Sequence, residues 1–433
     1  MNAAAISRRG FVKSMAVAGL AVQAGSLFAQ VPGGPRKLKV GLVGCGGRGS
    51  GALANLVEAA PLAGVELEVY AVADAFQERV DGVMKQFAVA PQRGFVGFDA
   101  YRKVMAEPID LVVLATPPNF RPIHFEAAVA AGKHAFIEKP VAVDAPGCRR
   151  ILAAGESAKQ KGLAVVAGAQ RRHLGSYLSN EHAIREGAVG RILGGTVMWN
   201  QDRLWFKERL PGESDANYLA RNWVNILEMS GDHIVEQHFH NLDVANWFIG
   251  RTPVAALGFG GRVRRITGNQ YDFFSVNYDY GQGCHINSSC RQINGTYTRV
   301  GEFFTGTEGV VYAGGKMEKF GGEVITQKEI VTHPDGQVQE QIDFLKSIVA
   351  GEPINDSKYV AETTLTAIMG RISAYTGQLV RWTDVATVGG PYYDIRLSPT
   401  AEDFETGAVV APAEGVVPRP GVDEVPQAAA PAV

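Results

Sequence analysis

The stretch Leu38–Gly49, which reads LKVGLVGCGGRG, is the clearest indication of fold class in this 433-residue sequence. A short apolar strand ends there at a G-x-G-x-x-G loop and a helical segment follows, the context that a dinucleotide-binding loop requires. Gly44 permits the tight turn, Gly46 lets the backbone approach a pyrophosphate, and Gly49 allows close packing of helix on strand. The helix start then offers free N–H groups to the phosphates. The predicted dinucleotide contacts in the loop are Gly44, Cys45, Gly46, Gly47, Arg48 and Gly49.

Four further short apolar runs follow the loop, at residues 65–73, 109–115, 135–137 and 163–166. Segments with helical spacing separate them, at residues 51–58, 76–87, 122–131 and 145–160. Near-continuous apolar runs are typical of strands covered on both faces of a parallel sheet. Their alternation with helices predicts an α/β domain with a doubly wound parallel sheet (a Rossmann fold) over residues 36–168.

The pattern changes after residue 168. Consecutive alternating runs between residues 255 and 312 predict an open, mostly antiparallel sheet in a second, α+β domain over residues 169–385. Helices are expected at residues 235–248, 339–350 and 359–376. The last stretch, 400–433, is rich in Ala, Pro, Val and Glu and predicts a flexible tail.

The composition and the N-terminus limit the classes of protein. The 42 Lys and Arg nearly balance the 44 Asp and Glu, which excludes a broadly basic nucleic-acid face. The segment Ser7–Lys13, with its paired arginines, resembles a twin-arginine export signal, and small residues follow an uncharged stretch. We therefore expect a signal peptide over residues 1–29 and a periplasmic or extracytoplasmic protein. No other stretch reaches the ~18 apolar residues of a membrane span.

Asp74 ends the second predicted strand and indicates which dinucleotide is bound. A carboxylate at that point accepts hydrogen bonds from the ribose hydroxyls and repels a 2′-phosphate. No Arg or Lys immediately follows it to receive such a phosphate. The sequence therefore predicts NAD in preference to NADP.

A series of motifs then carries a family resemblance. Thr116-Pro117-Pro118-Asn119 ends one strand, and Glu138-Lys139-Pro140 follows the next. With His124 and Gly132-Lys133-His134, this order resembles the glucose–fructose oxidoreductase/inositol dehydrogenase (Gfo/Idh/MocA) family, over residues 38–383. The resemblance implies a sugar oxidoreductase in which Lys139 lies beside nicotinamide and substrate, often before a cis proline. The further dinucleotide contacts that it implies are Thr116, Pro117, Asn119, His124, Glu138, Lys139 and Gln170.

Family members also carry an Asp-x-x-x-His pair, followed by Asp, on a helix. Here Glu236 stands for the first Asp, His240 for the His and Asp243 for the following acid. On one continuous helix Glu236 and His240 would share a face, and His238 would be turned about 200° away from Glu236. The hypothesis is that His240 is the general base, Lys139 polarises the sugar hydroxyl and Glu236 orients His240. The same helical geometry opposes a metal site, and none is predicted.

Two short segments are candidates for substrate contact. Arg172 and His173 follow the strand that leads into the second domain, where the resemblance implies that they face nicotinamide and substrate; a solvated arginine pair is the alternative. Asn222 and Trp223 precede the histidine segment and are predicted to line the sugar site, with the indole as a stacking face. The alternative for Trp223 is a plain buried side chain.

Three functions are compatible with these residues. An exported enzyme has no free nicotinamide pool and gains from keeping its dinucleotide bound. This fits an oxidoreductase that passes hydride between two sugars, and equally a redox-neutral glycosidase that oxidises a ring hydroxyl, eliminates the aglycone, adds water and restores the hydroxyl. A non-catalytic sugar-binding protein is the third reading. The family resemblance also implies a homo-oligomer, a dimer or tetramer that covers the open face of the second sheet.

Overall fold

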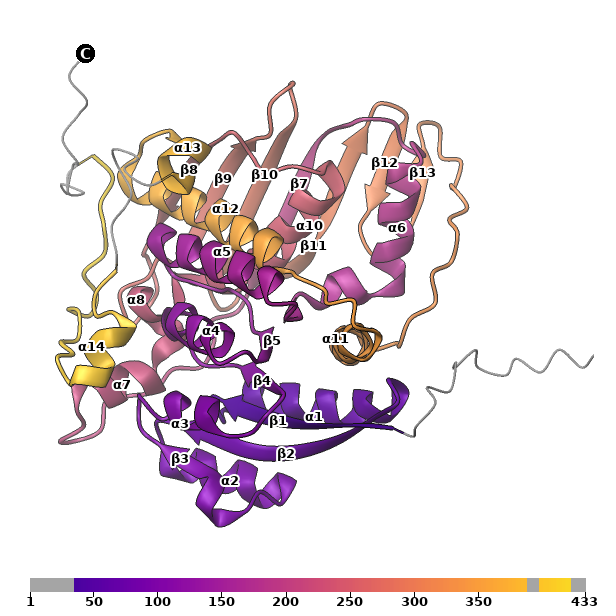
Figure 1. Cartoon of the computed structure of the whole chain (residues 1–433). Coiled ribbons are helices and arrows are strands. Elements are labelled where there is room, and N and C mark those ends of the chain that lie inside the picture. The colour runs from indigo at the N-terminus through magenta and orange to yellow at the C-terminus, as the bar shows by residue number, and fades with distance from the viewer. Residues whose placement is uncertain (1–34, 388–396, 422–433) are drawn as a thin grey trace, which may run out of the picture. The chain divides into compact units, whose positions relative to one another are not determined.

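The glycine-rich loop follows an inner strand of a six-stranded sheet in the computed structural model, which describes residues 35–387 and 397–421 (Figure 1). The strands are β1 (Arg36–Val43), β2 (Val65–Asp74), β3 (Gly94–Val96), β4 (Leu111–Leu114), β5 (His134–Ile137) and β6 (Val165–Ala167). They are parallel and in the order β3-β2-β1-β4-β5-β6. The predicted doubly wound sheet is confirmed. Its strand order reverses between β1 and β4, where such sheets open a ligand crevice.

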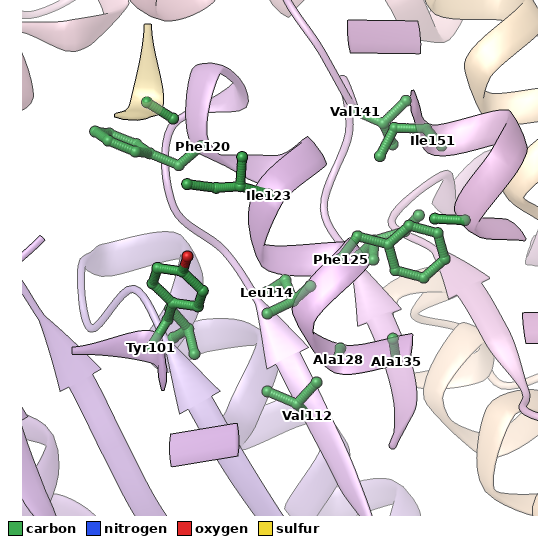
Figure 2. Packing of buried hydrophobic residues seen from close by; sticks show 14 of the residues in the cluster. Tyr101, Val112, Leu114, Phe120, Ile123, Phe125, Ala128, Ala135, Val141 and Ile151 are labelled. Atoms are coloured by element: carbon green, nitrogen blue, oxygen red, sulfur yellow. The ribbon is translucent and has the colours of Figure 1, made fainter. Parts of the chain in front are cut away.

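Helices cover both faces of this sheet. They are α1 (Gly47–Leu62), α2 (Gln77–Phe87), α3 (Tyr101–Ala106), α4 (Arg121–Ala130) and α5 (Ala145–Gln160), joined by short 3₁₀ turns η1 (Pro91–Arg93) and η2 (Pro118–Phe120). Figure 2 shows the hydrophobic cluster on one of these faces, where Leu114 of β4, Phe125 of α4 and Ile151 of α5 belong to the same packing. All three side chains are fully buried. The sheet is therefore held from both sides, and the ends of its strands are left to form the site.

The second sheet has eight strands and confirms the predicted open, mostly antiparallel layer. They are β7 (Ile192–Gln201), β8 (Ala255–Gly261), β9 (Phe273–Asp279), β10 (His285–Gln292), β11 (Arg299–Gly306), β12 (Gly309–Tyr312), β13 (Met317–Lys319) and β14 (Val380–Arg381). The order is β13-β12-β11-β7-β10-β9-β8-β14, and β7 and β10 are its parallel pair. Two helices, α10 (Phe239–Ile249) and α12 (Ser357–Thr376), pack on one face (Figure 1).

The remaining helices follow β6 in the chain, and two of them, η3 and α6, connect the two sheets. They are η3 (Gln170–His173), α6 (Gly175–Arg185), α7 (Asp215–Arg221), η4 (Trp223–Asn225), α8 (Leu227–Ser230), α9 (His233–Glu236), α11 (Gly336–Ala350) and α13 (Trp382–Ala386). The prediction of one helix over 235–248 was wrong, because α9 ends at Glu236 and α10 begins at Phe239. At the break, the buried His238 ring is hydrogen-bonded to the Ser288 hydroxyl at 2.7 Å. No helix formed by the described residues is both long and apolar enough to cross a bilayer.

The C-terminal part of the chain differs from the predicted tail. Residues 397–421, which we call the C-terminal strap, include the helix α14 (Ala401–Thr406). Phe404 packs its ring against Phe98 and Phe120, with centroids 5.0 and 4.9 Å apart. Further along, the Tyr271 hydroxyl donates to the carbonyl of Pro418 at 2.6 Å. The strap therefore contacts both domains; the remaining predicted tail, 422–433, and the predicted signal, 1–29, lie outside the described residues.

Candidate active site

A cavity of about 550 Å³ lies at the ends of β1, β2, β4 and β5 and is closed by residues of the second domain. That volume is in the usual range for a pocket that holds a small molecule. Residues of α9, α10 and η4 and of the segment around residue 205 complete its wall. The predicted site residues found in this wall are Gly44, Gly46, Gly47, Arg48, Gly49, Asp74, Thr116, Pro117, His124, Glu138, Lys139, Gln170, Trp223, Glu236 and His240.

The glycine-rich loop has the geometry that a pyrophosphate needs. Gly44 has a φ of +100°, which a side chain would strain. A Cβ on Gly49 would lie 1.8 Å from the Gly44 carbonyl oxygen, so this glycine is required for helix α1 to pack on the turn. A Cβ on Gly46 would meet nothing nearer than 3.9 Å, and one on Gly47 nothing within 4 Å. The loop therefore leaves an open cradle at the N-terminus of a 16-residue helix, where phosphate groups bind favourably.

The end of β2 carries Asp74 and an arginine that the sequence reasoning missed. The Asp74 carboxylate accepts hydrogen bonds from the backbone N–H of Cys45 at 2.7 Å and of Phe76 at 3.1 Å. Burial raises its pKa, which the neighbouring Arg79 and these N–H groups oppose. Arg79 lies 3.8 Å from Asp74 and over the Phe76 ring, at the cavity wall. The expected ribose position therefore has a cation beside it, the guanidinium of Arg79, which comes five residues after Asp74 in the sequence.

Lys139 and Glu236 form the centre of the site. The Lys139 ammonium donates to the Glu236 carboxylate at 3.0 Å and to the backbone carbonyl of the same residue at 2.6 Å. The Lys139–Pro140 peptide bond is cis, as the family resemblance implied. The expectation that Glu236 orients His240 is corrected here, because the break between α9 and α10 removes the shared helical face and Glu236 is paired with Lys139 instead.

His240 lies in the same cavity wall and is held by ring packing. Its imidazole stacks on Trp199 with centroids 5.8 Å apart and meets Phe239 edge to face. The residue is 7% exposed. Burial lowers the pKa of His240 well below its usual value, and the positive charge of Lys139 is the second cause of this shift. The imidazole is therefore neutral at neutral pH, and one of its ring nitrogens has a free lone pair to accept a hydrogen bond.

An ion-pair chain joins the glycine-rich loop to the Glu-Lys-Pro segment. Arg48 donates to the Glu138 carboxylate at 2.5 Å, and its guanidinium lies 3.5 Å from Glu340 of α11. Both carboxylates are buried, and burial raises the pKa of Glu340 well above its usual value. Gly168 makes room for Glu138, because a Cβ there would lie 2.7 Å from its carboxylate. These contacts fix the backbone that carries Lys139.

Arg121 and His124 form a second buried pair in the wall. Arg121 donates to the carbonyl of Thr116 at 2.7 Å and to that of Pro140. Burial lowers its pKa to about 10. The His124 ring is hydrogen-bonded to the Thr116 hydroxyl at 3.1 Å, and burial lowers its pKa to about 3. Arg121 thereby ties the loop after β4 to the loop after β5, a role that the sequence reasoning missed.

Five predicted residues lie outside the cavity wall, and two of them, Cys45 and Asn119, were predicted to contact the dinucleotide. The Cys45 thiol is buried and donates to the Ala73 carbonyl at 3.4 Å, so that only its backbone belongs to the loop. The Asn119 amide donates to the carbonyls of Glu228 and Pro399, both at 3.0 Å. These two residues support the site from behind instead of facing it.

The predicted substrate residues are corrected in the same way, with one exception. Arg172 makes a two-pronged ion pair with Asp243 at 2.8 and 2.9 Å. His173 bonds Asp343 at 2.6 Å. Asn222 is fully buried and accepts from the backbone N–H of Lys207 at 2.9 Å. Trp223 alone of the four lines the cavity.

Comparison with known proteins agrees with this architecture. Residues 38–168 match the model of the Gfo/Idh/MocA oxidoreductase family, NAD-binding Rossmann fold. The match covers the predicted dinucleotide-binding domain, and inositol dehydrogenases are among the proteins to which the chain is similar.

Curated relatives are similar over part of the chain. An inositol 2-dehydrogenase/D-chiro-inositol 3-dehydrogenase of Lactiplantibacillus plantarum is 26% identical over 49% of this chain and 52% of its own length. A 2,7-anhydro-N-acetylneuraminate hydratase of Escherichia coli is 27% identical over 42% of this chain and 45% of its own length. The chain thus spans about half the length of the curated relatives it matches.

A solved structure shares the fold over most of this chain. The aldose–aldose oxidoreductase of Caulobacter crescentus is 19% identical, with a TM-score of 0.62 over 80% of this chain and all of that one. At that identity the likeness concerns the fold.

Proposed function

We propose that the protein oxidises a carbohydrate hydroxyl with an NAD that it keeps bound. The observation that carries the proposal is that Lys139, Glu236 and His240 share the cavity that the glycine-rich loop opens. A lysine and a neutral histidine in one buried site, next to a dinucleotide cradle, suit removal of a hydroxyl proton while hydride leaves the same carbon.

The residues divide the work as follows. Bound NAD supplies the acceptor for the hydride. Lys139 donates a hydrogen bond to the sugar oxygen and stabilises the charge that develops there, and Glu236 holds its ammonium in place. His240 takes the hydroxyl proton, because its imidazole is neutral and the surrounding cations oppose earlier protonation. The aromatic rings around His240 keep water away from it.

Two observations support NAD and its retention. Asp74 is an acceptor at the ribose position, although Arg79 beside it would lessen the repulsion of a 2′-phosphate. The C-terminal strap packs Phe404 on Phe98 and Phe120, two residues of the cavity wall. A dinucleotide behind this wall would leave slowly. Retention also suits the export that the paired arginines Arg8 and Arg9 predict, because a secreted enzyme must recycle its own dinucleotide.

The second candidate function is glycoside cleavage without net redox change. In it the same hydroxyl is oxidised and later restored, and the glycosidic bond breaks by elimination in between. One observation supports this second candidate: the E. coli relative is named a hydratase, an enzyme that adds water, and water addition is one step of the cleavage. A non-catalytic sugar-binding protein would not need the pairing of Lys139 with Glu236.

We further propose a homo-oligomer in which the outer face of the second sheet is covered. On β8, Leu257 and Phe259 point to that face and are 39% and 66% exposed. Light scattering on the purified protein should give a dimer or tetramer. Phe259→Lys should shift it toward monomer, and a monomeric wild-type protein would contradict this part of the proposal.

One incubation tests the proposed function. Purified mature protein is mixed with a panel of sugars and glycosides without added cofactor, and the products are identified by mass spectrometry. An oxidised sugar together with a reduced partner supports the oxidoreductase. A hydrolysed glycoside with no net redox change supports the second candidate, and no conversion of any sugar by dinucleotide-loaded protein would contradict both.

A further inference from the structure

Two tryptophans, Trp205 and Trp223, line the cavity but have no role in the proposed chemistry. Trp205 comes from the irregular segment before α7, and Trp223 begins η4. Their ring centroids are 6.4 Å apart and their planes meet at 69°. We call this pair the aromatic corner. Trp205 is 47% exposed, whereas the side chains of Lys139 and Glu236 in the same cavity wall are 14% and 13% exposed.

The exposed position of Trp205 is fixed by buried amides. The Asn225 side chain donates to the Trp205 carbonyl at 3.1 Å, and Asn222 accepts from the Lys207 backbone at 2.9 Å. Asn222 in turn donates to the Thr267 hydroxyl at 3.1 Å. Both asparagines are almost completely buried. The fold thus holds a large apolar ring open to solvent in the wall of a cavity, where a ligand would bury it.

The aromatic corner and Glu236 line the same cavity and come from consecutive elements of the chain. Its η4 turn packs on α8, and α8 packs on α9, which ends in Glu236. The adenosine side is set instead by Asp74 at the end of β2, and β2 and β5 are separated by β1 and β4. A ligand on the aromatic corner would therefore share one cavity with the reacting sugar.

We propose that the aromatic corner binds a second pyranose ring, so that the substrate is a glycoside of at least two sugar rings. Pyranose rings present C–H groups on one face and hydroxyls at the edge, which suits an apolar ring surface that is open to water on one side. The reacting ring contacts Lys139 in the buried part of the cavity, and the next ring reaches outward to Trp205. This inference rests on the proposed function and names its substrate class.

The test compares disaccharides with their own monosaccharides. Tryptophan fluorescence measures binding of cellobiose, maltose, lactose, glucose and galactose to dinucleotide-loaded protein in the Lys139→Met background, so that no turnover interferes. At least one disaccharide is expected to bind about tenfold tighter than its monosaccharide, which corresponds to ~1.4 kcal/mol. Trp205→Ala should remove that advantage and Trp205→Phe should keep most of it. Trp382→Phe, in α13, is the matched control and should change neither affinity.

The outcomes separate this inference from the proposed function. Equal affinity for every disaccharide and its monosaccharide, or an advantage that survives in Trp205→Ala, would overturn the second-ring site. Loss of bound dinucleotide from Trp205→Ala, measured after denaturation, would overturn it as well, because the corner would then contact adenosine. Failure of the proposed function would appear independently, as absence of sugar oxidation in wild-type protein that binds these sugars normally.

Discussion

The ammonium of Lys139 is bonded to two oxygens of a single residue, the carboxylate and the backbone carbonyl of Glu236. Because the carbonyl belongs to the last residue of α9, the lysine is tied to the helix end as well as to a movable side chain. The family resemblance assigns this acid to the histidine; in this chain it positions the lysine.

Glu236→Gln should therefore lower kcat by about ten- to a hundredfold, because the neutral amide no longer holds the ammonium against the sugar oxygen. Bound dinucleotide should stay at the wild-type level. Steady-state kinetics on dinucleotide-loaded protein measures the first and absorbance after denaturation the second. Glu181→Gln, which removes a surface ion pair of α6, is the control. An unchanged kcat in Glu236→Gln would contradict the positioning role.

Two glycines of the loop should respond differently to alanine. Gly49→Ala places a Cβ 1.8 Å from a backbone oxygen and should cost about 1–3 kcal/mol of unfolding free energy. Gly46→Ala meets nothing closer than 3.9 Å, so its stability should be unchanged while dinucleotide binding falls, because the methyl group occupies the phosphate cradle. Urea unfolding of dinucleotide-free protein and the bound dinucleotide content measure the two effects. If Gly46→Ala kept full dinucleotide content, the phosphates would not lie on this loop.

The pH dependence follows from the lowered pKa of His240. The imidazolium is disfavoured by burial and by the charges of Lys139 and Arg171, so the base remains neutral as the pH falls through 6.5. The acid limb of kcat/KM should consequently lie well below pH 6.5. The double variant Arg171→Gln/Glu302→Gln replaces both members of a buried ion pair and so removes the positive charge of Arg171. It should move the acid limb to higher pH. A wild-type limb at 6.5 would show that His240 titrates as a solvated histidine.

Deletion of the C-terminal strap should speed the loss of dinucleotide. A chain that ends at residue 396 lacks Phe404 and exposes Phe98 and Phe120 of the cavity wall, whereas a chain that ends at 421 keeps all described strap contacts. Dissociation of dinucleotide into a large excess of scavenger dehydrogenase measures the rate. We expect a faster rate in the shorter chain and a wild-type rate in the longer one. Equal rates in both would exclude the strap from retention.

Contiguous motifs were the part of this molecule that the sequence could predict. The G-x-G-x-x-G loop and the Glu-Lys-Pro triplet carry their chemistry within a few residues, so that Gly44 and Lys139 were found where the structure has them in the cavity wall. The alternation of strand and helix predicted the first sheet, and consecutive runs with strand periodicity predicted the second. The strand β3 and the helix α3 were missed because three and six residues leave too little periodicity.

Contacts between distant segments were the part that the sequence could not predict. In the sequence, Arg121 looks like an ordinary helix residue. In the structure, its guanidinium donates hydrogen bonds to the loop after β4 and to the loop after β5. The strap has the composition of a linker, yet Phe404 is buried in the first domain's core. The break between α9 and α10 depends on His238 reaching Ser288 of another sheet strand. Such effects arise from tertiary packing, which overrides local pattern.

The most direct measurement is a single turnover by protein that carries its own dinucleotide. Loaded wild-type protein is mixed rapidly with its sugar, and the absorbance of reduced nicotinamide is followed. We expect a burst from wild-type protein, and none from Lys139→Met or His240→Phe although both hold as much dinucleotide. A full burst from Lys139→Met, or conversion of sugar at the normal rate by protein stripped of nucleotide, would contradict it.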